Sequence, residues 1–509
     1  MFRDMPSLAL LFAVVLWSAG SLRAADPAAE IRDQAIDLMQ TAVTVSPDGR
    51  HNSALRALRH LRDPALRPLF ARLAQASHPA LRINGMLGLA EISPEGKLPI
   101  EQLATIDDRA TLNEIIAFGM DNDLLSLDDA QKILAWQNID EGVKVVILMR
   151  LTRDVRAANE KLLREANQSD ISGRRGAAAL MLADIGAPDA PQLLKAASQP
   201  NAANHELVET QMLTLQAQHS FKNTGEWAYS LIMDPNVSPQ LELLGLSESM
   251  HQGVKPAQDR WYDRFRSSTD PSDRIRLALI ALDVAKNQPQ KIFQAMIDSG
   301  DPIITQAGRT AQAVANNAPD AAAQVVALIE LGHPIANGWV LRYANEQAAP
   351  QDRQAVLLGL ILTAQDGDRR GMQQRLDLAV AAAEMLAEKD PQAAAALLRP
   401  ILQDPDADPM VVQAILFGII RAQTDVGPQI VDGLQFIRNI DARNWTLLIK
   451  ARSNQPMTDR ELKNLGFIVQ GSGNIPDTFR LQAAWSYLKR TGQANAALEQ
   501  VLSRQQSAP

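Results

Sequence analysis

The sequence contains no cysteine. This absence excludes disulfides, thiol nucleophiles, thiolate zinc sites and iron–sulfur clusters. It also excludes haem attached through a C-x-x-C-H motif and a lipid attached through an N-terminal cysteine. We therefore expect no cofactor.

Aromatic residues are also scarce, and acidic residues slightly outnumber basic ones. Phe, Trp and Tyr make up only 4% of the 509 residues, and the formal net charge is -8. A mildly acidic chain is a poor ligand for a polyanion, so we expect no nucleic-acid partner. Apolar residues at 46% and charged residues at 21% are typical of a folded chain, and the abundant alanine favours helices that pack closely.

Catalytic and metal-binding motifs are missing as well. The chain has no H-E-x-x-H, no G-x-S-x-G and no G-x-x-x-x-G-K-[ST] motif. Asp404, Asp406 and Asp408 resemble the first half of a calcium loop, but Pro409 and Ile415 stand where an EF-hand needs Gly and Glu. A turn between helices, built from Asp caps and Pro, explains this segment better. We expect neither a catalytic residue nor a metal site.

The N-terminus has the pattern of an export signal. An apolar run at 8–17 follows a short charged start, and small and polar residues at 18–25 follow the run. This order predicts a signal peptide over 1–24, cleaved after Ala24, with a cut after Ser21 as an alternative. An uncleaved anchor is a further alternative, although the run is short for a bilayer. We expect a periplasmic or secreted protein.

The body of the chain repeats one pattern. A Pro or polar residue is followed by about fourteen residues with apolar positions at helical spacing, and successive starting points are 29 to 34 residues apart. These starting points are residues 79, 108, 140, 172, 205, 239, 271, 302 and 334. An earlier unit begins near residue 51, and 25–48 has room for an N-terminal cap helix.

Each period has room for a second helix. Segments such as 126–136, 190–198 and 289–298 carry apolar residues at helical spacing between the starting points. Pro is tolerated in a first helical turn, and Asp270 and Asp301 stand before such prolines as candidate N-caps. No segment alternates apolar and polar residues over several positions, so strands are not expected.

These units resemble HEAT repeats of the short kind, over residues 49–347. The resemblance implies an all-α fold, a right-handed α-solenoid of stacked antiparallel helix pairs whose second helices line the inner face. Such arrays serve mainly as scaffolds and adaptors.

From residue 348 the spacing changes. Helical patterns continue at 351–365, 375–390 and 410–423, and 477–504 resembles a tetratricopeptide helix pair broken at Gly492. We interpret 348–509 as an irregular helical-repeat region, either a continuing solenoid or a C-terminal cap.

Two groups of residues are candidate binding sites. Trp227 and Trp261 are one period apart, with Tyr229 and Tyr262 beside them, and would form an aromatic ladder if second helices line the inner face. Ordinary packing between repeats is the alternative. Arg260 and Arg264 flank Trp261 and suit an acidic or planar ligand.

The second group is basic. Arg56, Arg59 and Arg62 step by three, so they could share one flank of a helix and dock an acidic partner or an anionic membrane surface. The alternative is a solvated face whose long side chains cover apolar surface. We expect contact with a membrane only through this basic face or through an uncleaved N-terminal segment.

Two function classes follow. The first is an exported, noncatalytic scaffold or adaptor that binds a protein partner on its helical-repeat surface. The second is a periplasmic enzyme acting on cell-wall glycan or polysaccharide, which would need an aromatic cleft with paired carboxylates. The scarcity of aromatics favours the first.

Overall fold

The computed structural model describes residues 50–491, apart from ten short gaps at 94–95, 99, 200–204, 235–236, 332–333, 365–371, 423–426, 435–439, 454–455 and 470–474. The predicted signal peptide (1–24) and cap helix (25–48) lie outside the described residues, and so does the second helix of the tetratricopeptide-like end. The C-terminal region is therefore described only as far as the first helix of that pair.

Every regular element in the described part of the chain is helical, and no strand occurs there. Helices pack mainly against neighbours in the sequence, which is the arrangement of an all-α solenoid. The predicted fold class is therefore confirmed. No helix in these ranges is long and apolar enough to cross a membrane.

The chain forms two compact units. One, here called the terminal unit, combines the described residues up to Gly96 with those from Ile440 onward, and the central unit comprises the described residues between Lys97 and Leu434. The described elements of the terminal unit are α3 (Arg50–Arg59), η1 (Pro64–Leu66), α4 (Arg67–Leu73), α5 (Pro79–Glu91), α28 (Ile440–Arg452), α29 (Asp459–Val469) and α30 (Asp477–Thr491).

In the terminal unit, the first described helix packs against the last one, α3 against α30. Gln482 donates its amide to the carbonyl of Ala57 (2.8 Å), and the indole N–H of Trp485 donates to Asp63 Oδ2 (2.9 Å). Lys489 forms an ion pair with the same carboxylate at 3.0 Å. Helices α3 and α30 therefore belong to one compact unit, although Ala57 and Gln482 are 425 residues apart in the sequence.

The central unit contains the remaining helices in chain order. They are α6 (Ile100–Leu103), α7 (Arg109–Asp121), α8 (Leu127–Ile133), α9 (Glu141–Arg150), α10 (Arg153–Ala158), α11 (Glu160–Asn167), α12 (Ser172–Ile185), α13 (Ala190–Ser198), α14 (His205–His219), α15 (Gly225–Leu231), α16 (Pro239–His251), α17 (Lys255–Ser267), α18 (Pro271–Asp283), η2 (Ala285–Asn287), α19 (Gln290–Ile297), α20 (Pro302–Ala315), α21 (Ala321–Glu330), α22 (Pro334–Glu346), α23 (Pro350–Leu362), α24 (Met372–Lys389), α25 (Pro391–Gln403), α26 (Pro409–Arg421) and α27 (Gly427–Val431).

The predicted repeat starts are the first turns of helices in the structure. Pro239, Pro271 and Pro302 are the first residues of α16, α18 and α20. The two predicted N-caps are confirmed, because Asp270 accepts a bond from Ser272 N (2.9 Å) and Asp301 accepts one from Ile303 N (2.9 Å). The periodic pattern therefore located these helices correctly.

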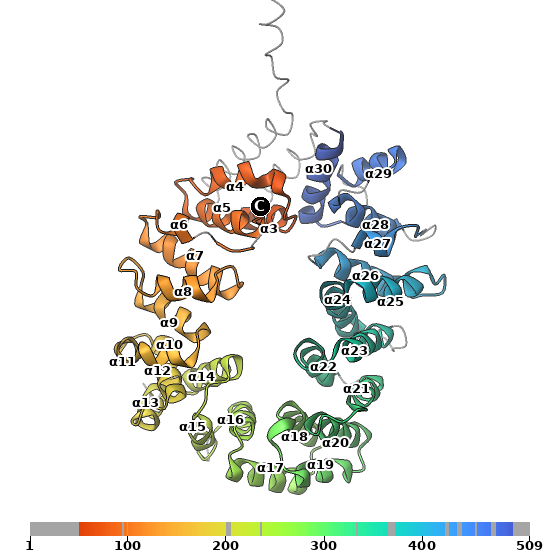
Figure 1. Cartoon of the computed structure of the whole chain (residues 1–509). Coiled ribbons are helices and arrows are strands. Elements are labelled where there is room, and N and C mark those ends of the chain that lie inside the picture. Colours follow the sequence, from red (N-terminus) through yellow and green to blue (C-terminus); the bar gives the residue numbers. More distant parts are fainter. Residues whose placement is uncertain are drawn as a thin grey trace, which may run out of the picture. The chain divides into compact units, whose positions relative to one another are not determined.

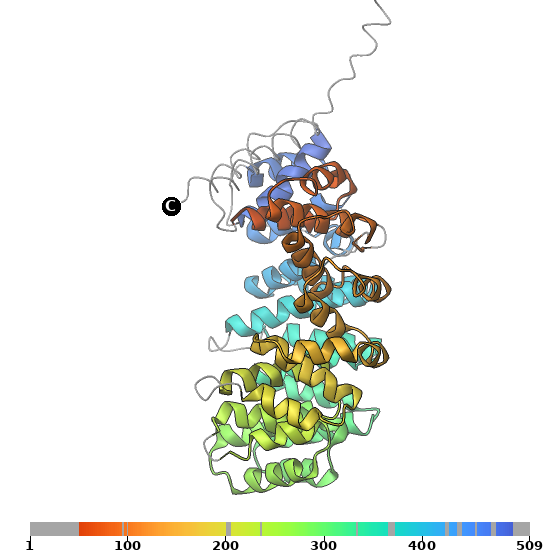
Figure 2. The ribbon, with the colours of Figure 1, turned by 90° about the vertical axis from the view of Figure 1, so that its left-hand side faces the viewer.

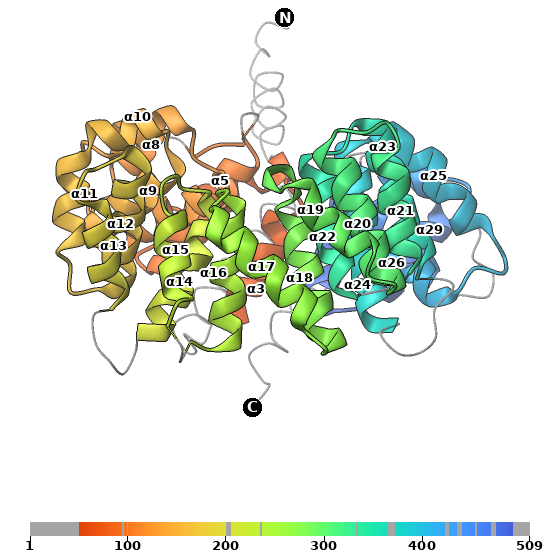
Figure 3. The same cartoon turned by 90° about the horizontal axis from the view of Figure 1, so that it is seen from below.

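Two kinds of contact build the stack in the central unit. A helix packs on the next helix in the chain, as α15 on α16 and α19 on α20, and on the equivalent helix of the next pair, as α12 on α14 and α14 on α16. Figure 2 shows such helices in successive layers, and Figure 3 shows α19, α20 and α21 side by side. Figure 1 shows α14, α16, α18 and α22 on one side of this stack and α13, α15, α17 and α19 on the other.

Small residues allow this close packing. In α12 the residues from Ala177 to Ala183 are all at most 3% exposed, and four of them are alanines. Their methyl groups let α12 contact helices before and after it, including α9, α11, α13 and α14. The high alanine content is thus used in the core.

The change of spacing near residue 348 falls inside the central unit. Across that position α21 packs on α23, and α22 packs on α24. The stack therefore continues beyond the proposed end of the HEAT-like segment, and the division at 347/348 stays a prediction about repeat type.

Candidate functional site

The two candidate tryptophans belong to the core. Trp261 on α17 is fully buried, its ring stacks on Phe265 with centroids 4.8 Å apart, and its N–H donates to the carbonyl of Leu277 (2.8 Å). Trp227 on α15 is 6% exposed. Trp261 is therefore a packing group that a ligand does not reach, whereas Trp227 lines a separate cavity with Glu209 and Asp234. The two rings do not form one ladder.

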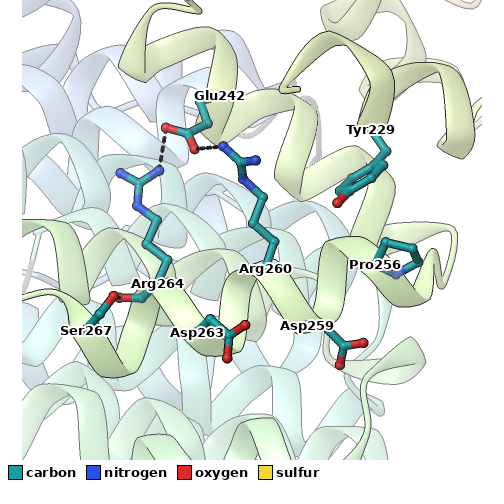
Figure 4. Close-up of a pocket in the computed structure, with 8 residues that line it drawn as sticks. All are labelled: Tyr229, Glu242, Pro256, Asp259, Arg260, Asp263, Arg264 and Ser267. Atoms are coloured by element: carbon teal, nitrogen blue, oxygen red, sulfur yellow. Dashed lines mark hydrogen bonds and ion pairs between the residues drawn. The ribbon is translucent and has the colours of Figure 1, made fainter. Parts of the chain in front are cut away.

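Arg260 and Arg264 line a shallow surface pocket with Tyr229, but their charges are already paired (Figure 4). Glu242 on α16 forms ion pairs with Arg260 at 2.7 Å and with Arg264 at 2.6 Å, and Arg264 also pairs with Asp273 on α18 at 2.6 Å. The arginines thus join α17 to the helices on both sides. An acidic ligand would have to displace these carboxylates.

Tyr262 lies apart from that pocket. Its half-buried ring is covered by the ammonium of Lys291 at 5.2 Å and the guanidinium of Arg266 at 5.6 Å from the ring centre. These cation–π contacts occupy its face. Of the six residues in the first predicted site, only Tyr229, Arg260 and Arg264 come together around one pocket.

The predicted basic flank is divided between surface and core. Arg56 and Arg62 are exposed, whereas Arg59 is 5% exposed. Arg59 donates to both carboxylate oxygens of Glu91 (2.6 and 2.9 Å) and to Asn84 Oδ1 (3.1 Å). Because α3 ends at Arg59, Arg62 lies beyond the helix, with φ at +48°, and the three arginines do not share one helical face.

The aspartates at 404–408 act as the turn interpretation predicted. Asp404 Oδ1 accepts from the backbone N–H of Asp406 (2.9 Å), and Asp408 Oδ1 accepts from that of Met410 (2.7 Å). Asp408 is thereby the N-cap of α26.

A different cavity has the strongest arrangement of functional groups. It has a volume of about 630 Å³ and lies among α14, α16, α18 and α22. We call it the carboxylate cavity. Its walls are Thr214, Ala217, Gln218, Ser220, Ser247, Glu248, His251, Asp283, Val284, Trp339, Arg342, Tyr343, Glu346 and Gln347.

Glu248 is the unusual group of this cavity. The residue is only 8% exposed, and no hydrogen bond or ion pair is found for its carboxyl among the described residues. Burial raises the pKa of this carboxyl to about 7, and the charge of Asp283 adds to the shift. Near neutral pH the group is therefore divided between its neutral and charged forms.

The opposite wall is a single face of α22. Trp339, Arg342, Tyr343 and Glu346 recur at helical spacing, and the rings of Trp339 and Tyr343 stack with centroids 5.4 Å apart. Arg342 forms an ion pair with Asp283 on α18 at 2.6 Å. The two residues are 59 positions apart in the sequence, so this pair joins α22 to α18. Burial raises the pKa of Asp283, while the charge of Arg342 opposes this effect.

The sequence contained one signal for this cavity. Leu241, Gly245 and Glu248 fall on the stripe of α16 that helical spacing assigns to the core, and all three are buried. A carboxylate on a buried stripe is costly unless it has a role or a partner. The remaining wall could not be predicted, since it depends on α18 meeting α22 across intervening helices.

We predict that Glu248→Gln stabilises the central unit at high pH and not at low pH. The folded-state pKa of Glu248 lies above its ordinary value of 4.5, so its contribution to stability is complete below pH 4.5 and is lost as the pH rises through about 7. The variant should gain up to about 3 kcal/mol over the wild type at pH 9, from about 1.4 kcal/mol per pKa unit.

Denaturant unfolding of both proteins at pH 4.5 and pH 9 measures this difference. Comparing the variant with the wild type at each pH cancels the titration of the groups that do not interact with Glu248. A gain of equal size at both pH values would contradict the assignment.

No protein-family model matches this chain, and no curated protein is similar enough to match it.

Proposed function

We propose that this chain is an exported, noncatalytic helical-repeat protein of the short HEAT type that binds a protein partner over the carboxylate cavity. The proposal is supported mainly by the side chains that line this cavity. Side chains from four helices converge there, and one of them is a buried carboxyl for which the described part of the chain supplies no hydrogen bond or ion pair. A surface assembled from successive repeats is the usual binding surface of a solenoid.

The cavity also matches the place where binding sites form in helical proteins. A concave space between helices, lined by aromatic groups and a few polar groups, buries much of a bound segment. Trp339 and Tyr343 supply the aromatic part and Glu248, Asp283 and Arg342 supply the polar part. The apolar run and small residues at the N-terminus support a periplasmic or secreted location.

A photo-cross-linking experiment tests this proposal. A benzophenone amino acid replaces Gln218, which is exposed and lines the cavity, or Gln192, which is exposed on α13 at the other side of the stack. Each protein is irradiated with the exported fraction of the source cells. We expect one protein to be cross-linked from position 218 and not from position 192. Equal cross-linking from both positions, or none from 218, would contradict the proposal.

One observation favours a second candidate, an enzyme acting on cell-wall glycan or polysaccharide. Glu248, with its raised pKa, could serve as a general acid, with Asp283 and two stacked aromatic rings in the same cavity. Purified peptidoglycan and polysaccharide would be incubated with the wild type, Glu248→Gln and Asp283→Asn. New reducing ends that appear with the wild type and disappear with both variants would favour the enzyme over the scaffold.

A further inference from the structure

We propose that the carboxylate cavity binds a protonated alkylamine, the chemical group at the end of a lysine side chain. Its ammonium lies against Glu248, and its aliphatic stem lies along Trp339 and Tyr343. This inference rests on the proposed function only in using the same cavity, and it identifies the chemistry that is recognised there.

The charges of the cavity favour a cation. Among its lining residues Arg342 pairs with Asp283 at 2.6 Å, and this ion pair is neutral overall. Glu248 and Glu346 remain without a positive partner among the described residues, while His251 is the other titratable group that could become positive. When both glutamates are ionised the cavity carries a surplus of two negative charges, which attracts a cation and repels an anion.

Because Glu248 is buried, its ionised carboxylate needs a hydrogen-bond donor, and an ammonium group is such a donor. With 8% exposure, its carboxylate has lost most of its water and gains no hydrogen bond from the described part of the chain in return. An ammonium would supply a charge-assisted hydrogen bond, which is about twice as strong as one between neutral groups. A neutral ligand would leave the charged form of this carboxyl poorly compensated.

The remaining wall selects an organic cation over a metal ion. A hard metal ion takes several oxygen ligands at once, and no group of three His, Asp or Glu side chains in the described ranges could hold one. Trp339 and Tyr343 line the cavity, and the part of each residue that stays exposed, 6%, gives methylene groups an apolar surface. Aromatic side chains also attract ammonium groups directly.

Binding should be linked to proton release. An ammonium stabilises the ionised form of Glu248, so affinity rises between pH 6 and pH 8 as this carboxyl loses its proton. The titratable and charged groups that line the cavity with Glu248 are His251 on its own helix, Asp283 on α18, and Arg342, Tyr343 and Glu346 on α22. A variant of Glu248 is needed to separate the effect of this carboxyl from the effects of these other groups.

Isothermal titration calorimetry of the full chain tests the inference. The probes are Nα-acetyl-lysine methylamide and 1,5-diaminopentane, with the Nε-acetylated lysine derivative as the uncharged control. The proteins are the wild type, Glu248→Gln, and Glu226→Gln as a matched change at an exposed glutamate of α15. Titrations at pH 7 in two buffers of different ionisation enthalpy measure the protons released.

We expect both amines to bind the wild type and Glu226→Gln, and to bind Glu248→Gln at least about tenfold more weakly and without proton release. Tighter binding of the lysine derivative supports a partner's side chain as the source, and tighter binding of the diamine supports a free polyamine. Equal affinity of the Nε-acetylated control, unchanged affinity of a folded Glu248→Gln, or no binding of either amine overturns the inference.

The two experiments test the protein partner and the ammonium ligand independently. If the amines bind through Glu248 but no protein is cross-linked from position 218, the ligand chemistry stands and the protein partner is rejected. If a protein is cross-linked from 218 but neither amine binds, the partner stands and the ammonium inference is rejected.

Discussion

Replacing Trp261 by alanine is expected to destabilise the central unit by about 3–5 kcal/mol. The side chain is fully buried, and the change removes its stack on Phe265 and its hydrogen bond to the carbonyl of Leu277. Hydrogen exchange of α16, α17 and α18, together with denaturant unfolding, measures the loss. Helical arrays unfold locally, so the effect should be largest in these three helices.

Tyr262→Ala on the same helix is the control for the Trp261 variant. Its half-buried ring contacts cations at the surface, so we expect a loss below about 1 kcal/mol. Wild-type stability of Trp261→Ala would show that the indole is not a core group and would restore the aromatic ladder. A binding defect of the Trp261 variant otherwise reports loss of folding and does not identify a contact surface.

Replacing Arg59 by alanine should cost about 3–5 kcal/mol in the terminal unit, because removing one partner of a buried ion pair leaves the other uncompensated. The side chains of Arg59 and Glu91 are only 6% and 12% exposed, and their closest atoms are 2.6 Å apart. The change also removes the bond from Arg59 to Asn84. Exchange protection of α3 and α5 and the thermal midpoint measure the effect.

Arg56→Ala is the matched control, since Arg56 is exposed on the same helix and its removal should change stability by at most about 0.5 kcal/mol. A double variant, Arg59→Met with Glu91→Leu, should recover much of the loss because it removes both buried charges together. Similar small effects for Arg56→Ala and Arg59→Ala would mean that both arginines belong to one solvated basic face.

The sequence could not predict which of these arginines is buried or which distant group each one binds. Arg56 and Arg59 have the same side chain and lie in one helix, yet one faces water and the other binds Glu91, 32 residues further along. Helical spacing assigns a face to each residue, but it does not say which distant group that face will meet. The same is true of Arg260 and Arg264, whose partners lie on α16 and α18.

The sequence by itself determined the local structure of this protein. The recurrence of apolar residues at helical spacing and the position of Asp and Pro at helix starts located the helices, because these signals act within a few residues. Only the tertiary structure decided which ends and faces come together. Packing of α3 on α30, and the cavity where α18 meets α22, depend on contacts between residues that are far apart in the sequence. No local pattern records such contacts, so the buried Glu248 could be recognised as unusual, but its surroundings could not be predicted.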